Sequence, residues 1–150
     1  MGLPLPERYA VLFGALAPWQ GIETALAAAT DDSWPDDVAL VVVGDGALRP
    51  AVDAAASANP ARLVALDTRP YAEMPRILAG AVCSLVLSGR AGEWGLSPLK
   101  LYESMASGVT VNNISNDTNM AAGAAAVPTS YAVKTYVDAQ VLSGGSMLPA

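Results

Sequence analysis

The most informative stretch of this sequence reads GLSPLKLYESMASG and spans residues 95–108. Ser97 is a favourable N-cap residue, and Pro98 suits the first position of a helix because that position needs no backbone N–H donor. Gly108 is the expected C-terminal stop. At about 100° per residue, one apolar arc is formed by Leu99, Leu101, Tyr102, Met105 and Ala106. We therefore predict a short helix that buries this arc.

The start of this helix is a candidate anion site with two charged residues nearby. Glu103 lies at the edge of the apolar arc, and Lys100 lies one turn earlier on the polar side. The positive end of the helix dipole faces a Gly-rich loop, and helix starts of this kind bind phosphate groups. The hypothesis is a phosphate at the mouth of the helix, with a hydroxyl-rich sugar against the carboxylate. The alternative is an ordinary capped helix whose glutamate faces solvent.

The composition indicates a packed globular protein rather than a nucleic-acid or membrane protein. The 150 residues are 53% hydrophobic, the mean hydropathy is +0.36 and the net charge is −6. The sequence has no Lys/Arg cluster, which argues against a nucleic-acid partner. It has no bilayer-length apolar run and no signal pattern, so we expect a cytoplasmic protein. With no His and one Cys, Cys83, we expect neither a metal site nor a Ser-His-Asp or Cys-His triad within this chain.

Apolar strands and helices alternate along residues 9–111. Strands are expected at 9–14, 38–43, 62–66, 82–87 and 109–111, with helices at 22–30, 47–58 and 74–79 between the first four. Continuously apolar strands separated by helices are typical of a parallel sheet that is covered on both faces. The fold class is therefore α/β, a doubly wound, Rossmann-like sheet. Ligands of such sheets bind outside the carboxyl ends of the strands, here near the Gly-containing loops 14–21, 44–46 and 88–96.

The Gly44-Asp45-Gly46 motif after the second expected strand is open to two interpretations. A dinucleotide fingerprint needs a third glycine three residues after the second one, and Arg49 stands at that position. The two glycines are also consistent with a tight turn between a strand and a helix, and this interpretation is the one we favour.

Four motifs occur in a specific order: FGALAPWQG at 13–21, VVGDG at 42–46, the segment 70–82 that begins with Pro70-Tyr71, and SPLKLYESMASG at 97–108. In this order they resemble the C-terminal, nucleotide-sugar-binding domain of family 4 glycosyltransferases of the GT-B fold. The resemblance covers residues 9–111 and gives a domain at 1–111. It implies metal-independent transfer of a sugar from a nucleoside diphosphate sugar, with no other cofactor.

The resemblance also implies a donor site. Its predicted residues are Gly14, Trp19, Gln20, Gly21, Arg90, Ser97, Leu99, Lys100 and Glu103. The first four lie near the diphosphate, backbone amides at the start of the last helix face the phosphates, and Glu103 holds the ribose hydroxyls. Arg90 and Lys100 are the cations best placed to offset the diphosphate charge, with ordinary surface charge as the alternative. No catalytic residue is assigned.

The sequence departs from the family pattern in three ways. Gln20 stands where a lysine is usual, which removes a charge near the phosphates. Many members carry two glutamates separated by seven residues; the partner of Glu103 would be Gly95, and Glu93 lies two positions away. The chain also starts at the second domain. We therefore expect a donor-binding half, incomplete for catalysis alone, that pairs with a missing N-terminal domain or acceptor-binding subunit.

From Asn112 the composition becomes small and polar, and we expect an extension over 112–150 with a mobile end. The motif VPTSYAVKTYVDAQ at 127–140 gives residues 112–141 a resemblance to a repeat segment of phage tail fibres. A short helix is expected there, with Val133, Tyr136, Val137 and Val141 on one face. That face docks on the sheet of its own chain or on copies of itself, which would give a homo-oligomer. The alternative function is a virion-associated structural or assembly module without turnover.

Overall fold

The computed structural model of this protein describes residues 5–87 and 98–114. The strands are β1 (Tyr9–Phe13), β2 (Ala39–Val43), β3 (Leu63–Leu66), β4 (Cys83–Leu87) and β5 (Val111–Ile114). The helices are α1 (Ile22–Thr30), α2 (Arg49–Ala58), α3 (Met74–Ala79) and α4 (Pro98–Ala106), with 3₁₀ turns η1 (Pro18–Gln20) and η2 (Tyr71–Glu73). The tail-fibre motif at 127–140 and the short helix expected there lie outside the described residues.

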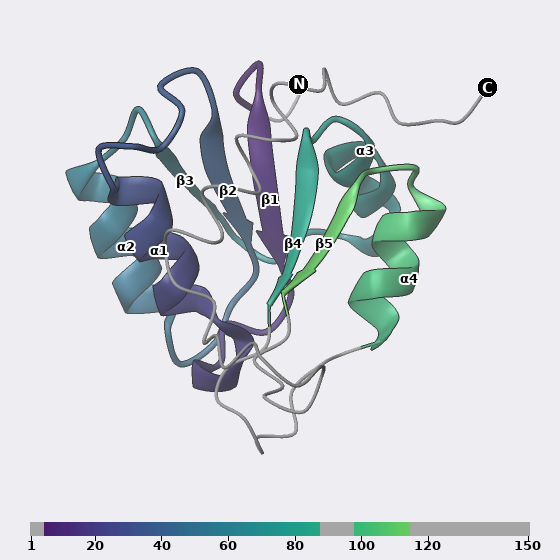
Figure 1. The fold of residues 1–150 in the computed structure, drawn as a ribbon. Coiled ribbons are helices and arrows are strands. Elements are labelled where there is room, and N and C mark those ends of the chain that lie inside the picture. Colours follow the sequence, from purple (N-terminus) through teal and green to yellow (C-terminus); the bar gives the residue numbers. More distant parts are fainter. Residues whose placement is uncertain (1–4, 88–97, 115–150) are drawn as a thin grey trace, which may run out of the picture.

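The strands form one parallel sheet in the order β3-β2-β1-β4-β5. Because the strands are parallel, their carboxyl ends meet at the same edge of the sheet, and all the arrowheads in Figure 1 point to that edge. The order of the strands reverses between β1 and β4. Crevices at such a reversal, outside the carboxyl ends, are where doubly wound sheets bind ligands.

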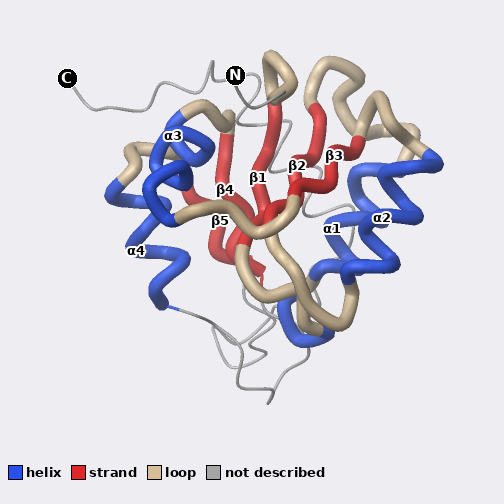
Figure 2. Tube along the Cα trace, turned by 180° about the vertical axis from the view of Figure 1, so that it is seen from behind, coloured by secondary structure: helices blue, strands red, loops and turns tan. Residues whose placement is uncertain are grey.

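Helices cover both faces of the sheet, as Figures 1 and 2 show from opposite sides. Side chains alternate between the faces along each strand. Leu12, Leu40 and Leu85 pack in the cluster that includes residues of α1 and α2, whereas Val11 and Val41 pack against α3. This arrangement confirms the predicted doubly wound α/β fold.

Cys83 lies in the first of these clusters and is fully buried. Burial raises the pKa of its thiol to about 12, because the charged thiolate would lose its hydration. A buried thiol of this kind is a core residue rather than a reactive one.

The bounds of the last two elements confirm one prediction and correct another. Helix α4 begins at Pro98, and Gly108 follows its end with a φ of 74° and donates its N–H to the carbonyl of Met105. The last strand, expected at 109–111, runs from Val111 to Ile114 instead. Its length follows from pairing with β4, where Ser84 lies opposite Val111 and the register continues for three more residues. Backbone pairing of this kind accommodates polar residues that composition would place in a loop.

The apolar arc predicted for α4 is not its buried face. Leu99, Tyr102 and Met105 are 67%, 63% and 62% exposed, whereas Ser104 is fully buried. The hydroxyl of Ser104 lies 2.9 Å from that of Ser84 on β4. The helix therefore turns a polar residue toward the sheet, because the strand beneath it presents a polar partner.

This buried pair of hydroxyls gives a stability test. Ser104→Ala leaves the Ser84 hydroxyl buried without its partner, which should lower the free energy of unfolding by about 1–2 kcal/mol. The double variant Ser84→Ala/Ser104→Ala removes both polar groups and should lose less than the sum of the two single variants. Urea unfolding followed by circular dichroism measures all three. Strict additivity would contradict a coupled pair.

Candidate functional site

The loops that follow β1 and β2 cross in direct backbone contact at the carboxyl edge of the sheet. Gly14 donates its N–H to the carbonyl of Val43 over 2.9 Å, and Leu16 donates to the carbonyl of Asp45 over the same distance. Gly44 has a φ of +144°, and a Cβ on it would overlap the carbonyl oxygen of Gly14. A Cβ on Gly46 would lie 2.8 Å from backbone atoms of Leu16. Close packing thus accounts for both glycines of the Gly44-Asp45-Gly46 motif.

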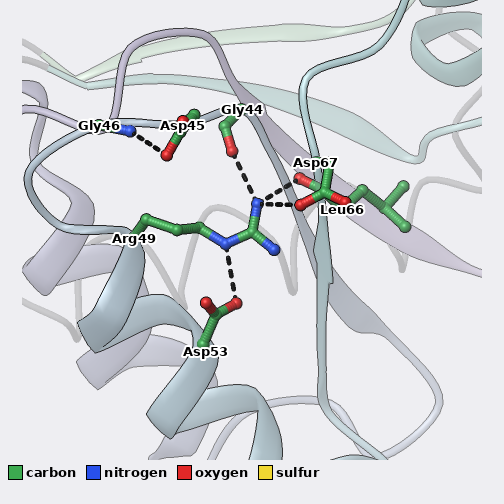
Figure 3. A network of polar contacts seen from close by, with 7 residues as sticks. All are labelled: Gly44, Asp45, Gly46, Arg49, Asp53, Leu66 and Asp67. Carbon is green, nitrogen blue, oxygen red and sulfur yellow. Dashed lines mark hydrogen bonds and ion pairs between the residues drawn. The ribbon is translucent and has the colours of Figure 1, made fainter.

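Arg49, the residue that breaks the dinucleotide fingerprint, connects the loop at Gly44 to the end of β3 and to α2 (Figure 3). Its Nη1 donates to the carbonyl oxygens of Gly44 and Leu66, over 3.0 and 3.3 Å, and lies 2.8 Å from the Asp67 carboxylate. Its Nε donates to Asp53 over 2.8 Å, and this hydrogen bond is the main reason that the pKa of Arg49 is raised. One guanidinium therefore fixes the ends of β2 and β3 relative to α2.

A pocket of about 320 Å³ opens beside these corners. Its lining includes Gly14 and Gly44 from the crossing loops, Thr68, Arg69 and Tyr71 after β3, and Glu103 from α4. The volume is on the scale of a small-molecule site. The pocket lies at the carboxyl edge, where the fold predicts a ligand, and it brings Glu103 to the same cavity as the first glycine loop.

Lys100 reaches inward from α4 to the first loop. Its Nζ donates to Oε1 of Gln20 over 2.6 Å. A Cβ on Gly14 would lie 2.5 Å from Cε of this lysine, so the lysine stem occupies the space beside the glycine. Burial lowers the pKa of Lys100 to about 8, although the charge of Glu103 acts in the opposite direction. Lys100, predicted to lie on the polar side of the helix, is partly buried and contacts η1 through the polar side chain of Gln20.

Of the remaining predicted site residues, the structure describes three and leaves two outside its described ranges. Gly21 has a φ of 67° and starts α1 against Leu87, where a Cβ would lie 2.7 Å from the leucine Cβ. Trp19 is 43% exposed in η1, and the side chain of Leu99 faces solvent, so a contact from Leu99 would have to come from its backbone. Arg90 and Ser97 lie outside the described residues.

The segment after β3 contributes pocket residues that the sequence analysis missed. Arg69 lines the pocket, and its Nε is buried without a hydrogen-bond partner in the described part of the chain. Thr68, Tyr71 and Met74 line the same cavity. The sequence did contain a signal for these residues, because they follow the third strand of a parallel sheet, and that strand ends at the same edge as the first two.

The pocket thus combines one carboxylate, one arginine and a nearby lysine. Residues 5–87 and 98–114 contain no group of three His, Cys, Asp or Glu side chains that could hold a metal ion. Within the same ranges, no helix has the length and apolar character that a membrane span requires. An acceptor carboxylate beside two donor cations suits a ligand that carries both hydroxyl groups and negative charge.

Comparisons with known proteins relate this fold to glycosyltransferases. No protein-family model matches the chain, and no curated protein sequence matches it. Among solved structures, it is similar to HepE of Anabaena in complex with UDP-glucose, with a TM-score of 0.65 and 16% identity over 91% of this chain and 39% of that chain. It is also similar to the catalytic domain of cholesterol-α-glucosyltransferase from Helicobacter pylori, with a TM-score of 0.66 and 11% identity over 92% of this chain and 88% of that one.

A third similar structure is WaaG, a glycosyltransferase involved in lipopolysaccharide biosynthesis, with a TM-score of 0.53 and 18% identity over 71% of this chain and 28% of that chain. The chain spans well under half the length of HepE and of WaaG. Together, these likenesses show that the chain has a glycosyltransferase-like fold.

The contact between the two loops predicts a large difference between two glycine substitutions. Gly44→Ala should lower the free energy of unfolding by about 3 kcal/mol or more, because its Cβ overlaps the Gly14 carbonyl at a strained φ. Gly108→Ala is the matched control: its φ of +74° is also positive, but nothing lies within 4 Å of the added Cβ, so the loss should be about 1 kcal/mol. Urea unfolding compares the two. Equal losses would mean that the close approach is not a constraint.

Proposed function

We propose that this chain binds a nucleoside diphosphate sugar at the carboxyl edge of its sheet, as the donor-binding half of a family 4 glycosyltransferase. The observation that carries the proposal is the position of Glu103 in the same pocket as Gly14 and Gly44, with Lys100 against Gly14. The similarity to HepE, which was solved with UDP-glucose and with UDP, supports the same class of ligand.

The Glu103 carboxylate suits the ribose of such a ligand. A carboxylate accepts hydrogen bonds at two oxygens, and the adjacent 2′- and 3′-hydroxyls of a ribose supply two donors at matching spacing. Glu103 lines the pocket from α4, a rigid element whose orientation the buried contact between Ser84 and Ser104 fixes. The backbone position of Glu103 is therefore set by the packing of α4 before the ligand binds.

The start of α4 and its lysine suit the diphosphate. The first backbone N–H groups of a helix have no partner within the helix, and they carry the positive end of its dipole. Lys100 adds a full charge close to the Gly14 corner. During sugar transfer, the bond between the anomeric carbon and the diphosphate oxygen breaks while an acceptor oxygen bonds to that carbon. Positive groups at the diphosphate stabilise the charge on the leaving group without a metal.

The acceptor site and the catalytic base are proposed to come from a second domain or subunit. The described pocket is built from one sheet and its helices, and HepE and WaaG are considerably longer than the part this chain matches. The proposal therefore concerns donor binding by this chain and sugar transfer by the larger assembly, in the cytoplasm.

Ligand binding by the unmodified protein and by a Glu103 variant tests the proposal. Isothermal titration with UDP, GDP and their glucose conjugates should give saturable binding for at least one base. Glu103→Gln keeps the size of the side chain but removes its charge, and it should weaken that binding at least about tenfold, as expected for a charge-assisted hydrogen bond.

The matched control is Glu23→Gln. Glu23 is an exposed residue of α1, and α1 covers the face of the sheet opposite to α4. Substitution of Glu23 should leave the affinity unchanged. Absence of binding in the unmodified protein, or equal affinities in all three proteins, would refute the proposal.

A further inference from the structure

Helix α4 turns its apolar side away from the sheet. Leu99, Tyr102 and Met105 are all exposed, and because they follow one another at intervals of three they lie along one side of the helix. These three residues are referred to as the α4 stripe. A surface helix normally buries such a stripe and exposes its charged residues. In α4 the charged residues, Lys100 and Glu103, are partly buried instead.

The described neighbours of α4 leave this stripe uncovered. The helix packs on β4 and β5, and it contacts α3 along one flank. Figure 1 shows that α4 lies beyond β5, at one end of the sheet. Ala106, which lies one turn after Tyr102, also lines a mostly apolar hollow of about 120 Å³ between α3 and α4. The apolar surface therefore extends from the stripe toward α3.

The size of the stripe favours a partner within the same chain over a second copy. Its three side chains expose on the order of 400 Å² together, whereas each partner of a stable complex buries about 800 Å². Separate molecules must also offset the translational and rotational freedom that they lose on association, and a tethered segment does not. A small apolar face of this kind is therefore better suited to a segment of its own chain.

The sequence contains one segment with a matching face. Residues 127–141, outside the described part of the chain, predict a short amphipathic helix whose apolar face combines Val133, Tyr136, Val137 and Val141. A helix of this length is marginal in water by itself, so its apolar face needs a surface. Strands β1, β2 and β4 are buried along their whole length, which leaves no open face on them. The α4 stripe does offer one.

The place where the described chain ends allows this segment to reach α4. β5 is the edge strand of the sheet, and it packs against α4. Its last residue, Ile114, lies at the carboxyl edge, which is also the edge where α4 begins (Figure 1). Residues 115–126 separate β5 from the segment and span up to about 40 Å when extended. The nine residues of α4 are only about 14 Å long, so the tether can reach either end of the helix.

We propose that residues 127–141 dock as a helix on the α4 stripe of their own chain. Their apolar face covers the stripe, while Lys134 and Asp138, on the opposite side of the predicted helix, stay in water. The docked segment supports the helix that carries Glu103 into the 320 Å³ pocket. This inference goes beyond the proposed function and does not depend on it, because it concerns how the chain covers its own surface.

Hydroxyl-radical footprinting of the full chain tests the contact, because the oxidation rate of a methionine side chain follows its exposure. Val133→Ser/Val137→Ser removes the apolar face of the segment and should raise the oxidation rate of Met105 about threefold, in proportion to the area uncovered. Thr135→Ser/Asp138→Asn is the matched control. It changes the opposite side of the predicted helix and should leave the oxidation rate of Met105 unchanged.

A reciprocal variant examines the same contact from the other side. Leu99→Ser/Tyr102→Ser removes most of the α4 stripe and should raise the oxidation rate of Tyr136 by a similar factor. Trp19 is partly exposed in η1 and serves as the internal reference. An unchanged rate at Trp19, together with an unchanged circular dichroism spectrum, shows that the variants remain folded.

Light scattering at the concentration of the footprinting experiment shows whether the protection arises within one molecule. A monomer in which Met105 is protected supports the inference. Equal oxidation of Met105 in the unmodified chain and in Val133→Ser/Val137→Ser overturns it, and so does protection that is confined to a dimer. No nucleotide is present in these measurements, so their outcome is separate from that of the Glu103 experiment.

Discussion

The close approach of two backbone segments at the carboxyl edge of the sheet is the constraint on which the rest of this structure depends. The loops after β1 and β2 touch without side chains between them, since Gly44 leaves no room for a Cβ beside the Gly14 carbonyl. Three backbone hydrogen bonds, donated by Gly14, Leu16 and Leu48, fix the position of one segment relative to the other. Arg49 then clamps the ends of β2 and β3 from α2. The part of the pocket wall that Gly14 and Gly44 form therefore consists of closely packed backbone.

The part of the pocket that Glu103 lines depends on how α4 is rotated about its own axis. The hydroxyl contact between Ser84 and Ser104 turns one face of the helix toward β4, and this rotation carries Lys100 toward Gln20 while Glu103 faces the cavity. The rotation of α4 therefore sets the direction of two charged side chains. The same rotation leaves Leu99, Tyr102 and Met105 on the solvent side.

The fold could be predicted from local signals, and the details of the site could not. Uninterrupted apolar strands, separated by helices of the right length, specify a covered parallel sheet, and Pro98 and Gly108 mark the ends of α4. The direction of α4 depends on what the strand beneath it presents, and helical periodicity contains no information about Ser84. Glu103 was found because a long motif surrounds it. Arg69 was missed because its role depends on a cavity that forms only when three strand ends meet.

The strand order also bears on how this chain acquires its structure. β1 lies in the middle of the sheet, and one of its two neighbours is β4, with Ala10 paired to Cys83. More than seventy residues must therefore be synthesised before that side of β1 is covered. Until then the nascent chain presents an open, apolar strand edge, and closing so long a loop slows the search for the native pairing. β1 is central to the sheet, and its edge stays exposed until β4 has been synthesised. Self-association through this edge competes with folding during that stage.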